Sequence, residues 1–313
     1  MSGRLDPAEM FPAGRADVRV HWVTLGSGLR LRVAESGRPD APVMLLVHGW
    51  GASIYMWRNW FVPLVAAGYR VLAVDLPGHG LSDKPDAAHF YRLDEMAGAL
   101  RELIEQEGLT GVDVVAQSMG GTISLEVTRT SGSRVRTLVL VNPACFGRVR
   151  NQKLLQLVGG KSWFDPILPK LVAKWLVART HRMVFGDPSG ITHRDEDELW
   201  APTQFPSFAL SMRLLLQEFT WDRPAVAEMT ARLQGIPARV MVVLGTLDRL
   251  VLDARPYVEA LVRGGAPLAV AISEGGGHAV NEERPDEVVA HVLDFTGQPH
   301  SQARTDAEEE EGK

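Results

Sequence analysis

Runs of apolar residues alternate along the chain with amphipathic segments. Val43–Val47 is apolar at every position, which is typical of a strand buried on both faces of a parallel sheet. Leu93–Glu107 instead has the spacing of a helix with one apolar face. The same alternation predicts further strands at Arg70–Val74, Val112–Ala116, Arg136–Val141, Ala238–Leu244 and Leu268–Ile272, and further helices at Met119–Thr130, Asp253–Arg263 and Pro285–Phe295. Strands that alternate with helices predict an α/β fold with a doubly wound, mostly parallel sheet.

The N-terminal part of the chain adds a different kind of strand. Val18–Leu25 and Leu29–Glu35 alternate between polar and apolar residues and are joined by the turn Gly26-Ser27-Gly28, so we expect an antiparallel pair. Ser53 is a candidate cap for a helix that runs to about Ala66. We expect residues 1–16 to form a loose leader.

The strand pattern disappears between Pro143 and Gly235. This region holds four of the eight Trp residues and six of the ten Phe residues, and helical spacing replaces the apolar runs at Leu154–Val158, Ile167–Val177 and Phe208–Phe219. We therefore predict a helical insertion packed over one end of the sheet. The expected organisation is a core of residues 17–142 and 236–297, a helical cap insertion of residues 143–235, and a disordered acidic tail of residues 298–313.

Composition excludes several classes of protein. The 313 residues are 45% apolar and 23% charged with a net charge of −5, which is typical of a globular protein. No basic stripe indicates a nucleic-acid surface, and no run of about 18 apolar residues predicts a membrane span. The single cysteine, Cys145, cannot form an internal disulfide, and Met1–Asp17 lacks the apolar core of a signal peptide. We therefore expect a cytoplasmic protein.

The first candidate for chemistry is Ser118. It follows the strand Val112–Ala116 and opens a helix, with small residues on either side at Ala116 and Gly120. This arrangement is typical of a nucleophile elbow, in which a tight turn exposes the serine hydroxyl. The helix N-terminus adds positive partial charge beside that hydroxyl. Taken alone, such a serine is more often a simple helix cap.

Asp248 and His278 supply the other groups of a catalytic triad. Asp248 comes just after a predicted strand, and His278 follows the Gly-rich loop after the last strand. A carboxylate there can orient the imidazole, which can take the proton of Ser118. Each residue alone is more often an ordinary turn or loop residue. The chain order Ser, Asp, His and the common position at strand ends predict that Ser118, His278 and Asp248 are catalytic.

Acyl transfer also requires two N–H donors for the developing oxyanion. Met119 follows the candidate nucleophile, and Trp50 lies in the loop after Val43–Val47. We therefore predict that the backbone N–H groups of Trp50 and Met119 form the oxyanion hole. His48, which begins that loop, is predicted to hold the loop in place.

These motifs resemble those of the α/β-hydrolase superfamily over residues 20–297. The segment VDLPGHGLS at residues 74–82 is similar to the family's loop after its fourth strand. The resemblance implies an eight-stranded sheet with a helical cap after the sixth strand, and it implies that Asp75 and His79 are structural. Ala116 departs from the family's usual Gly, and Gln117 from the His of many relatives. In the family the side chain at position 117 points away from the nucleophile, so this departure implies little.

The resemblance also narrows the set of reactions that the chain is expected to catalyse. Relatives that open epoxides or displace halides use a carboxylate nucleophile where this chain has Ser118. Epoxide-opening relatives also use cap tyrosines, whereas the tyrosines here all lie outside the predicted cap, at Tyr55, Tyr69, Tyr91 and Tyr257. The loop HGWGAS at residues 48–53 differs from those of prolyl aminopeptidases and of carbon–carbon bond hydrolases. The prediction is a serine carboxylesterase that forms an acyl-enzyme and needs no metal or organic cofactor.

The substrate is less well specified by the sequence. Aromatic residues of the cap and of the loop at residues 48–53, the oxyanion loop, favour a small to medium apolar ester, although such residues more often serve packing. Thioester, lactone and amide hydrolysis remain alternatives with the same triad, and so does a non-catalytic ligand-binding protein on this fold. The oligomeric state stays open. The candidate substrate-binding residues are Trp50, Trp163, Trp175, Phe205 and Phe208.

Overall fold

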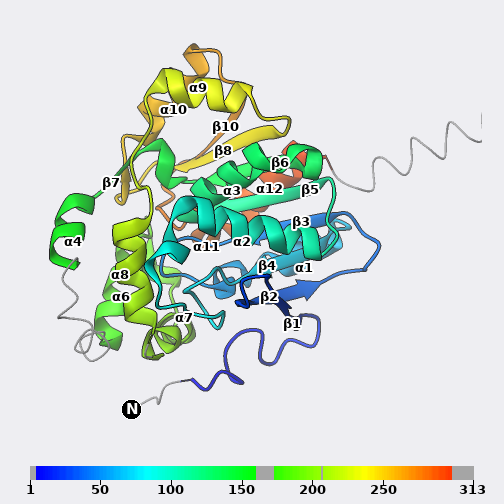
Figure 1. Ribbon diagram of the computed structural model, residues 1–313, viewed down its shortest axis with the longest axis vertical. Coiled ribbons are helices and arrows are strands. Elements are labelled where there is room, and N and C mark those ends of the chain that lie inside the picture. Colours follow the sequence, from blue (N-terminus) through cyan, green and yellow to red (C-terminus); the bar gives the residue numbers. More distant parts are fainter. Residues whose placement is uncertain (1–4, 160–172, 206, 298–313) are drawn as a thin grey trace, which may run out of the picture.

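The computed structural model describes residues 5–159, 173–205 and 207–297. Its core is one eight-stranded sheet with the strand order β1-β2-β4-β3-β5-β6-β8-β10 (Figure 1). β2 is antiparallel to β1 and β4, and the other neighbouring strands are parallel. The strands are β1 (Arg19–Thr24), β2 (Arg30–Ser36), β3 (Val43–Val47), β4 (Arg70–Val74), β5 (Val112–Gln117), β6 (Val135–Val141), β8 (Arg239–Gly245) and β10 (Leu268–Ser273). The predicted α/β sheet is confirmed.

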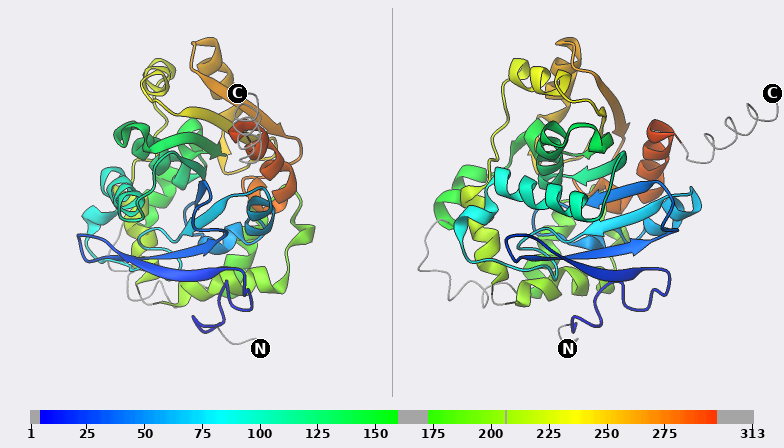
Figure 2. Two further views of the ribbon diagram at one scale, coloured as in Figure 1. Left: turned by 90° about the vertical axis from the view of Figure 1, so that its right-hand side faces the viewer. Right: turned by 45° about the vertical axis from the view of Figure 1, so that its right-hand side comes forward.

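Helices cover both faces of the sheet because its central strands are apolar at successive positions. In β3, Leu45 and Val47 pack into the core beneath α2 and α3, whereas Met44 and Leu46 pack into the core beneath α1 and α12. Figure 2 shows the two sets of helices on opposite sides of the sheet. These helices are α1 (Phe61–Ala66), α2 (Leu93–Gln106), α3 (Met119–Thr130), α10 (Ala254–Arg263) and α12 (Pro285–Thr296).

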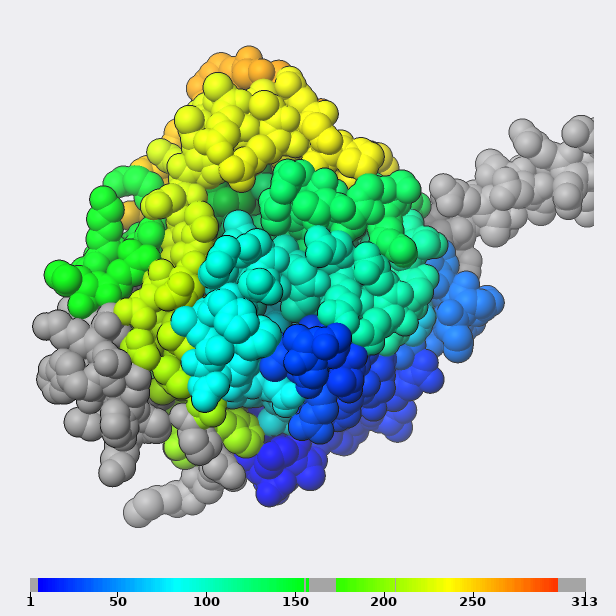
Figure 3. Space-filling model, viewed as in Figure 1, coloured from blue at the N-terminus to red at the C-terminus, as the bar shows by residue number. Residues whose placement is uncertain are grey.

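Most elements between β6 and β8 in the described residues are helices. One of these helices, α8, packs against the short turn η2 (Ala88–Tyr91) of the core, where the Tyr91 hydroxyl lies 2.7 Å from Ser211 Oγ. Figure 3 shows these two segments in contact at the surface. In the described residues, the α-helices of this region that precede α9 (Val226–Gln234) are α4 (Gln152–Gly159), α6 (Lys174–Met183), α7 (His193–Trp200) and α8 (Phe208–Glu218).

Two features of this region differ from the expected organisation. The helix α9 (Val226–Gln234) packs against α10, and its Met229 and Leu233 belong to the core beside the sheet. We therefore place the end of the cap before α9 and not at residue 235. A short strand, β7 (Arg148–Val149), also pairs with β9 (Val251–Leu252) in a region where no strand was expected.

The N-terminal leader is not loose throughout. Met10 and Phe11 are buried, and the Phe11 N–H donates to Glu198 of α7 at 2.8 Å. The Phe11 ring also packs edge-on to Tyr55 at a centroid distance of 5.9 Å. The expectation of a loose segment is therefore wrong for these residues, because an apolar pair anchors the leader against cap and core.

The helix expected from Ser53 to Ala66 is interrupted. Ser53 caps only the 3₁₀ turn η1 (Ile54–Trp57), and α1 does not begin until Phe61. Trp57 and Trp60 lie around the break, fully buried and edge-on to each other at 4.9 Å. Packing of these two large side chains explains why the segment departs from a single regular helix.

None of the helices in the described part of the chain combines the length and apolar character needed to cross a bilayer. The predicted acidic tail lies outside the described residues.

Arg58 joins the cap to the core through buried charges. Its guanidinium lies 2.8 Å from Asp195 of α7 and 2.6 Å from Glu282 of the short helix α11 (Val280–Glu283). Burial works to raise the pKa of Glu282, but His181 and Arg58 stabilise the carboxylate and hold that pKa below its usual value. The ion pairs therefore keep Glu282 charged inside the protein.

The variant Arg58→Met is expected to lower the free energy of unfolding by about 3–5 kcal/mol, because it leaves two buried carboxylates without their cation. Urea unfolding would measure this loss. The matched control is Arg92→Met, which breaks an exposed pair with Asp94 and should cost no more than about 1 kcal/mol. Equal losses for the two variants would contradict the inference that Arg58 neutralises two buried carboxylates.

Candidate active site

The structure brings Ser118, His278 and Asp248 together from three strand ends. Nε2 of His278 lies 2.9 Å from Ser118 Oγ, and Nδ1 of His278 lies 2.7 Å from Asp248 Oδ2. The side chains of His278 and Asp248 are each 6% exposed. With its proton on Nδ1, the imidazole donates to the carboxylate and can accept the serine proton at Nε2. The arrangement can therefore activate Ser118 as a nucleophile.

The backbone at Ser118 forms a strained turn between β5 and α3. Its φ of 51° lies in the left-handed region, which is uncommon for a residue other than glycine. The turn is held because the Ser118 N–H donates to Val141 at 3.0 Å and the Ser118 carbonyl accepts from Ala144 at 3.1 Å. A side chain at Gly120 would overlap the His48 carbonyl. The small residue therefore lets the helix start directly beneath the oxyanion loop.

The loop that carries Trp50 lies against this turn. A Cβ atom at Gly49 would be only 3.0 Å from the Cβ of Ser118. Met119 is the first residue of α3, so the helix does not use its N–H in an internal hydrogen bond. The two predicted oxyanion donors thus belong to backbone segments on either side of Ser118.

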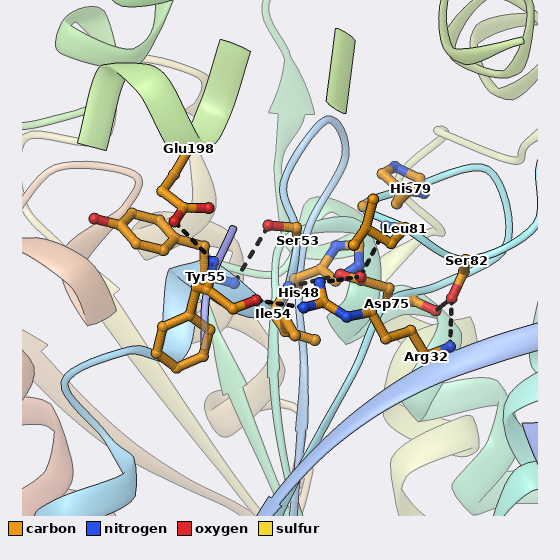
Figure 4. A network of polar contacts seen from close by, with 12 residues as sticks. Arg32, His48, Ser53, Ile54, Tyr55, Asp75, His79, Leu81, Ser82 and Glu198 are labelled. Atoms are coloured by element: carbon orange, nitrogen blue, oxygen red, sulfur yellow. Dashed lines mark hydrogen bonds and ion pairs between the residues drawn. The ribbon is translucent and has the colours of Figure 1, made fainter. Parts of the chain in front are cut away.

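His48 and Asp75 fix the oxyanion loop to the loop after β4 (Figure 4). Nε2 of His48 accepts from the Leu76 N–H at 3.0 Å, and its Nδ1 lies 2.8 Å from the Gly49 carbonyl. Burial lowers the pKa of His48, which favours the neutral ring. The Asp75 carboxylate accepts from the N–H groups of Ile54 and Leu81 at 2.8 and 3.0 Å. Both residues thus have the structural positions expected for them.

His79 is buried beside this network. Its ring centroid lies 4.9 Å from that of His48, and its Nδ1 lies 3.0 Å from the Pro77 carbonyl. Burial lowers the pKa of His79 well below its usual value. A neutral imidazole held within its own loop is consistent with the expected structural role.

Two residues that hold the histidine loop were not identified from the sequence. Asn142, with a φ of 42°, donates to the carbonyls of Gly277 and His278 at 2.9 and 3.0 Å and accepts from the Gly245 N–H at 3.0 Å. The side chain of Gln117 donates to the His278 carbonyl at 3.1 Å. Nothing in the sequence indicated that Gln117 holds the loop that carries His278. The sequence signal that could have identified Asn142 is its position directly after a predicted strand, because Asn is a residue type that tolerates positive φ.

The candidate substrate-binding residues have different surroundings. Trp50 is 38% exposed, and its ring lies edge-on to Trp221 at 6.4 Å. Phe208, at the start of α8, is buried in the large apolar cluster that continues into the core, whereas Trp175 on α6 is 69% exposed. Trp163 lies outside the described residues. Trp50 is thus the candidate that is partly exposed and that lies in the loop packed against the Ser118 turn.

Phe205, the remaining candidate, directly follows the 3₁₀ turn η7 (Ala201–Gln204). Its ring is 5.3 Å from the ammonium group of Lys84, which also donates to the Gly80 and Ser82 carbonyls at 2.8 and 2.9 Å. Burial lowers the pKa of Lys84 to about 8. Phe205 therefore packs on the loop after β4.

Among the described residues, no group of three or more His, Cys, Asp or Glu side chains is arranged to hold a metal ion. Cys145 is buried, and burial raises the pKa of its thiol to about 11. A thiol with a raised pKa is a poor nucleophile.

Comparison with known proteins gives a consistent assignment of family. A model described as the alpha/beta hydrolase family matches residues 44–291. The chain is 26% identical over 311 residues to Epoxide hydrolase A of Mycobacterium tuberculosis, covering 86% of this chain and 94% of that protein. It is 35% identical over 286 residues to Haloalkane dehalogenase of Psychrobacter cryohalolentis, covering 86% of this chain and 88% of that protein.

Solved structures resemble this one in fold. A carboxylesterase from Bacillus subtilis has a TM-score of 0.73 at 19% identity, over 93% of this chain and 94% of the other. A putative aryl esterase from Burkholderia cenocepacia has a TM-score of 0.72 at 21% identity, over 89% of this chain and 98% of the other.

Proposed function

Because the chain belongs to the α/β hydrolase family, we propose that it is a serine hydrolase that cleaves carboxylic esters of small to medium apolar substrates. The observation that carries the proposal is the 2.9 Å separation between Ser118 Oγ and His278 Nε2, with Asp248 2.7 Å from the other ring nitrogen. Such a set of groups is suited to nucleophilic acyl transfer.

In the proposed reaction, Ser118 Oγ attacks the ester carbonyl while His278 takes its proton. The backbone N–H groups of Trp50 and Met119 stabilise the oxyanion, each contributing about 3 kcal/mol. The tetrahedral intermediate expels the alcohol, which receives the proton from His278, and an acyl-enzyme remains. Water then attacks the acyl carbon with His278 as base, and the acid leaves as Ser118 regains its proton.

The identity of the nucleophile favours esters over the substrates that some relatives are named for. A serine oxygen that attacked the carbon of an epoxide or a haloalkane would form an ether, which offers water no carbonyl to attack. A carboxylate nucleophile would form an ester, which water can hydrolyse. Turnover with Ser118 therefore requires an acyl group. Matched thioesters, lactones and amides meet this requirement too, so their kcat/KM values would rank the alternatives.

A substrate panel tests the proposal. We expect hydrolysis of p-nitrophenyl esters, with the highest kcat/KM in the short to medium part of a series from acetate to palmitate, since the partly exposed Trp50 gives the oxyanion loop an apolar surface. Styrene oxide and 1-bromobutane, assayed for diol and bromide, serve as controls and should be unchanged. Release of diol or bromide without ester hydrolysis would overturn the proposal.

A further inference from the structure

The cap contacts the loop that carries His278. The Ala279 N–H donates to the carbonyl of Val184, in the segment after α6, at 3.1 Å. The backbones cross so closely that a Cβ atom at Gly186 would overlap the Gly275 carbonyl, and one at Gly277 would overlap the Gly186 nitrogen. Glycine at both positions therefore allows direct contact between the two backbones.

Glu283 joins these two segments through its carboxylate. It accepts from the N–H groups of Gly186 and Asp187 in the cap at 2.9 and 2.8 Å. It also accepts from the Gly277 N–H, next to His278, at 2.8 Å. Hydrogen bonds to an ionised acceptor are stronger than neutral ones. A single side chain thus ties the cap and the histidine loop together.

The histidine loop needs such contacts because three consecutive glycines, Gly275–Gly277, give it little stiffness of its own. On the side of the sheet, Asn142 and Gln117 donate to its carbonyls. On the side that faces the cap, Glu283 of α11 accepts from the Gly277 N–H, and the Val184 carbonyl of the cap accepts from the Ala279 N–H. The loop is therefore held on two sides, and on one of them the cap takes part.

We propose that Glu283 and the cap segment Val184–Asp187 position His278. The general base is then aligned with Ser118 only while this segment keeps its contacts with Glu283 and with the loop that carries His278. Glu283 is a positioning residue that acts through the Gly277 backbone. The kinetic consequence rests on the proposed function, whereas the coupling between cap and loop does not. A cap motion that admits substrate must therefore leave the segment Val184–Asp187 in place. If it displaced this segment, His278 would lose its alignment with Ser118.

The test perturbs the contact from the cap side with Gly186→Ala. Its control is Gly190→Ala in the same region, where an added Cβ meets nothing within 4 Å. We expect kcat for a p-nitrophenyl ester to fall about 10²-fold in Gly186→Ala, with KM little changed, because small misplacements of a catalytic group cost about this much. Gly190→Ala should match the wild type.

A second variant keeps the shape of the side chain. Glu283→Gln replaces one acceptor oxygen with an NH₂ group that faces N–H donors, and Glu287→Gln, whose carboxylate instead pairs with Arg284, is its control. We expect a fall in kcat with Glu283→Gln only, again with little change in KM. A loss confined to KM or to stability would overturn the positioning role.

Hydrogen exchange of the peptide around Gly275–Val280 separates the two proposals. We expect faster exchange in Gly186→Ala and Glu283→Gln than in the wild type and both controls. Wild-type exchange and wild-type kcat in these variants would overturn the coupling. If the wild-type protein hydrolysed no ester in a Ser118-dependent way, the proposed function would fail, and the exchange rates would still decide whether the cap fixes the loop.

Discussion

Replacement of Ser118 by alanine is expected to lower kcat for ester hydrolysis by at least about 10⁴-fold, because no acyl-enzyme can form without the hydroxyl. The fold should survive, since the hydrogen bonds that hold this turn come from the backbone of Ser118. Steady-state hydrolysis of a p-nitrophenyl ester measures the loss. Circular dichroism and the unfolding midpoint show that the variant is folded.

The matched control for this prediction is Ser124→Ala. Ser124 lies on α3, the helix that begins directly after Ser118, and it is buried. Its backbone carbonyl, not its hydroxyl, accepts the hydrogen bond from Thr128 Oγ1. Its variant should therefore keep wild-type activity. If Ser118→Ala retained most of the turnover while folded, the reaction would depend on another nucleophile and the triad assignment would be wrong.

The sequence predicts best those features that depend on local pattern. Val43–Val47 is a strand with the predicted bounds, because a run of five apolar residues suits a short strand buried between two helical layers. Ser118, Asp248 and His278 each follow a strand, and the parallel sheet brings such ends to one edge. Motif order and sheet topology together thus sufficed to find groups that lie far apart in the chain.

Features that depend on contacts between distant segments were not predictable in this way. The helix α7 is almost entirely polar, and its one local signal is a capping box of Thr192 and Asp195. The role of Glu283 depends on the meeting of Gly186 and Gly277, which are 91 residues apart. Nothing in the pattern around Glu283 distinguishes it from the acidic residues beside it, because the packing of the cap on the loop determines its partners.

Asp248→Asn is expected to lower kcat about 10⁴-fold while leaving the fold intact. One carboxylate oxygen accepts from the N–H groups of Leu250 and Val251 at 2.8 and 2.9 Å, and the asparagine carbonyl can replace it. The other oxygen lies 2.7 Å from His278 Nδ1. An NH₂ group there would donate to Nδ1 and move the ring proton to Nε2, where the imidazole could no longer take the proton of Ser118.

The control for this variant is Asp253→Asn. Asp253 pairs with Arg148 at the surface and has a φ of 61°, a conformation that asparagine tolerates. Its variant should keep wild-type kcat/KM, and both variants should keep the wild-type unfolding midpoint. If Asp248→Asn retained more than about a tenth of kcat, the carboxylate would not set the ring orientation, as its role in a triad requires. The backbone contacts of the histidine loop would then be sufficient to align His278 with Ser118.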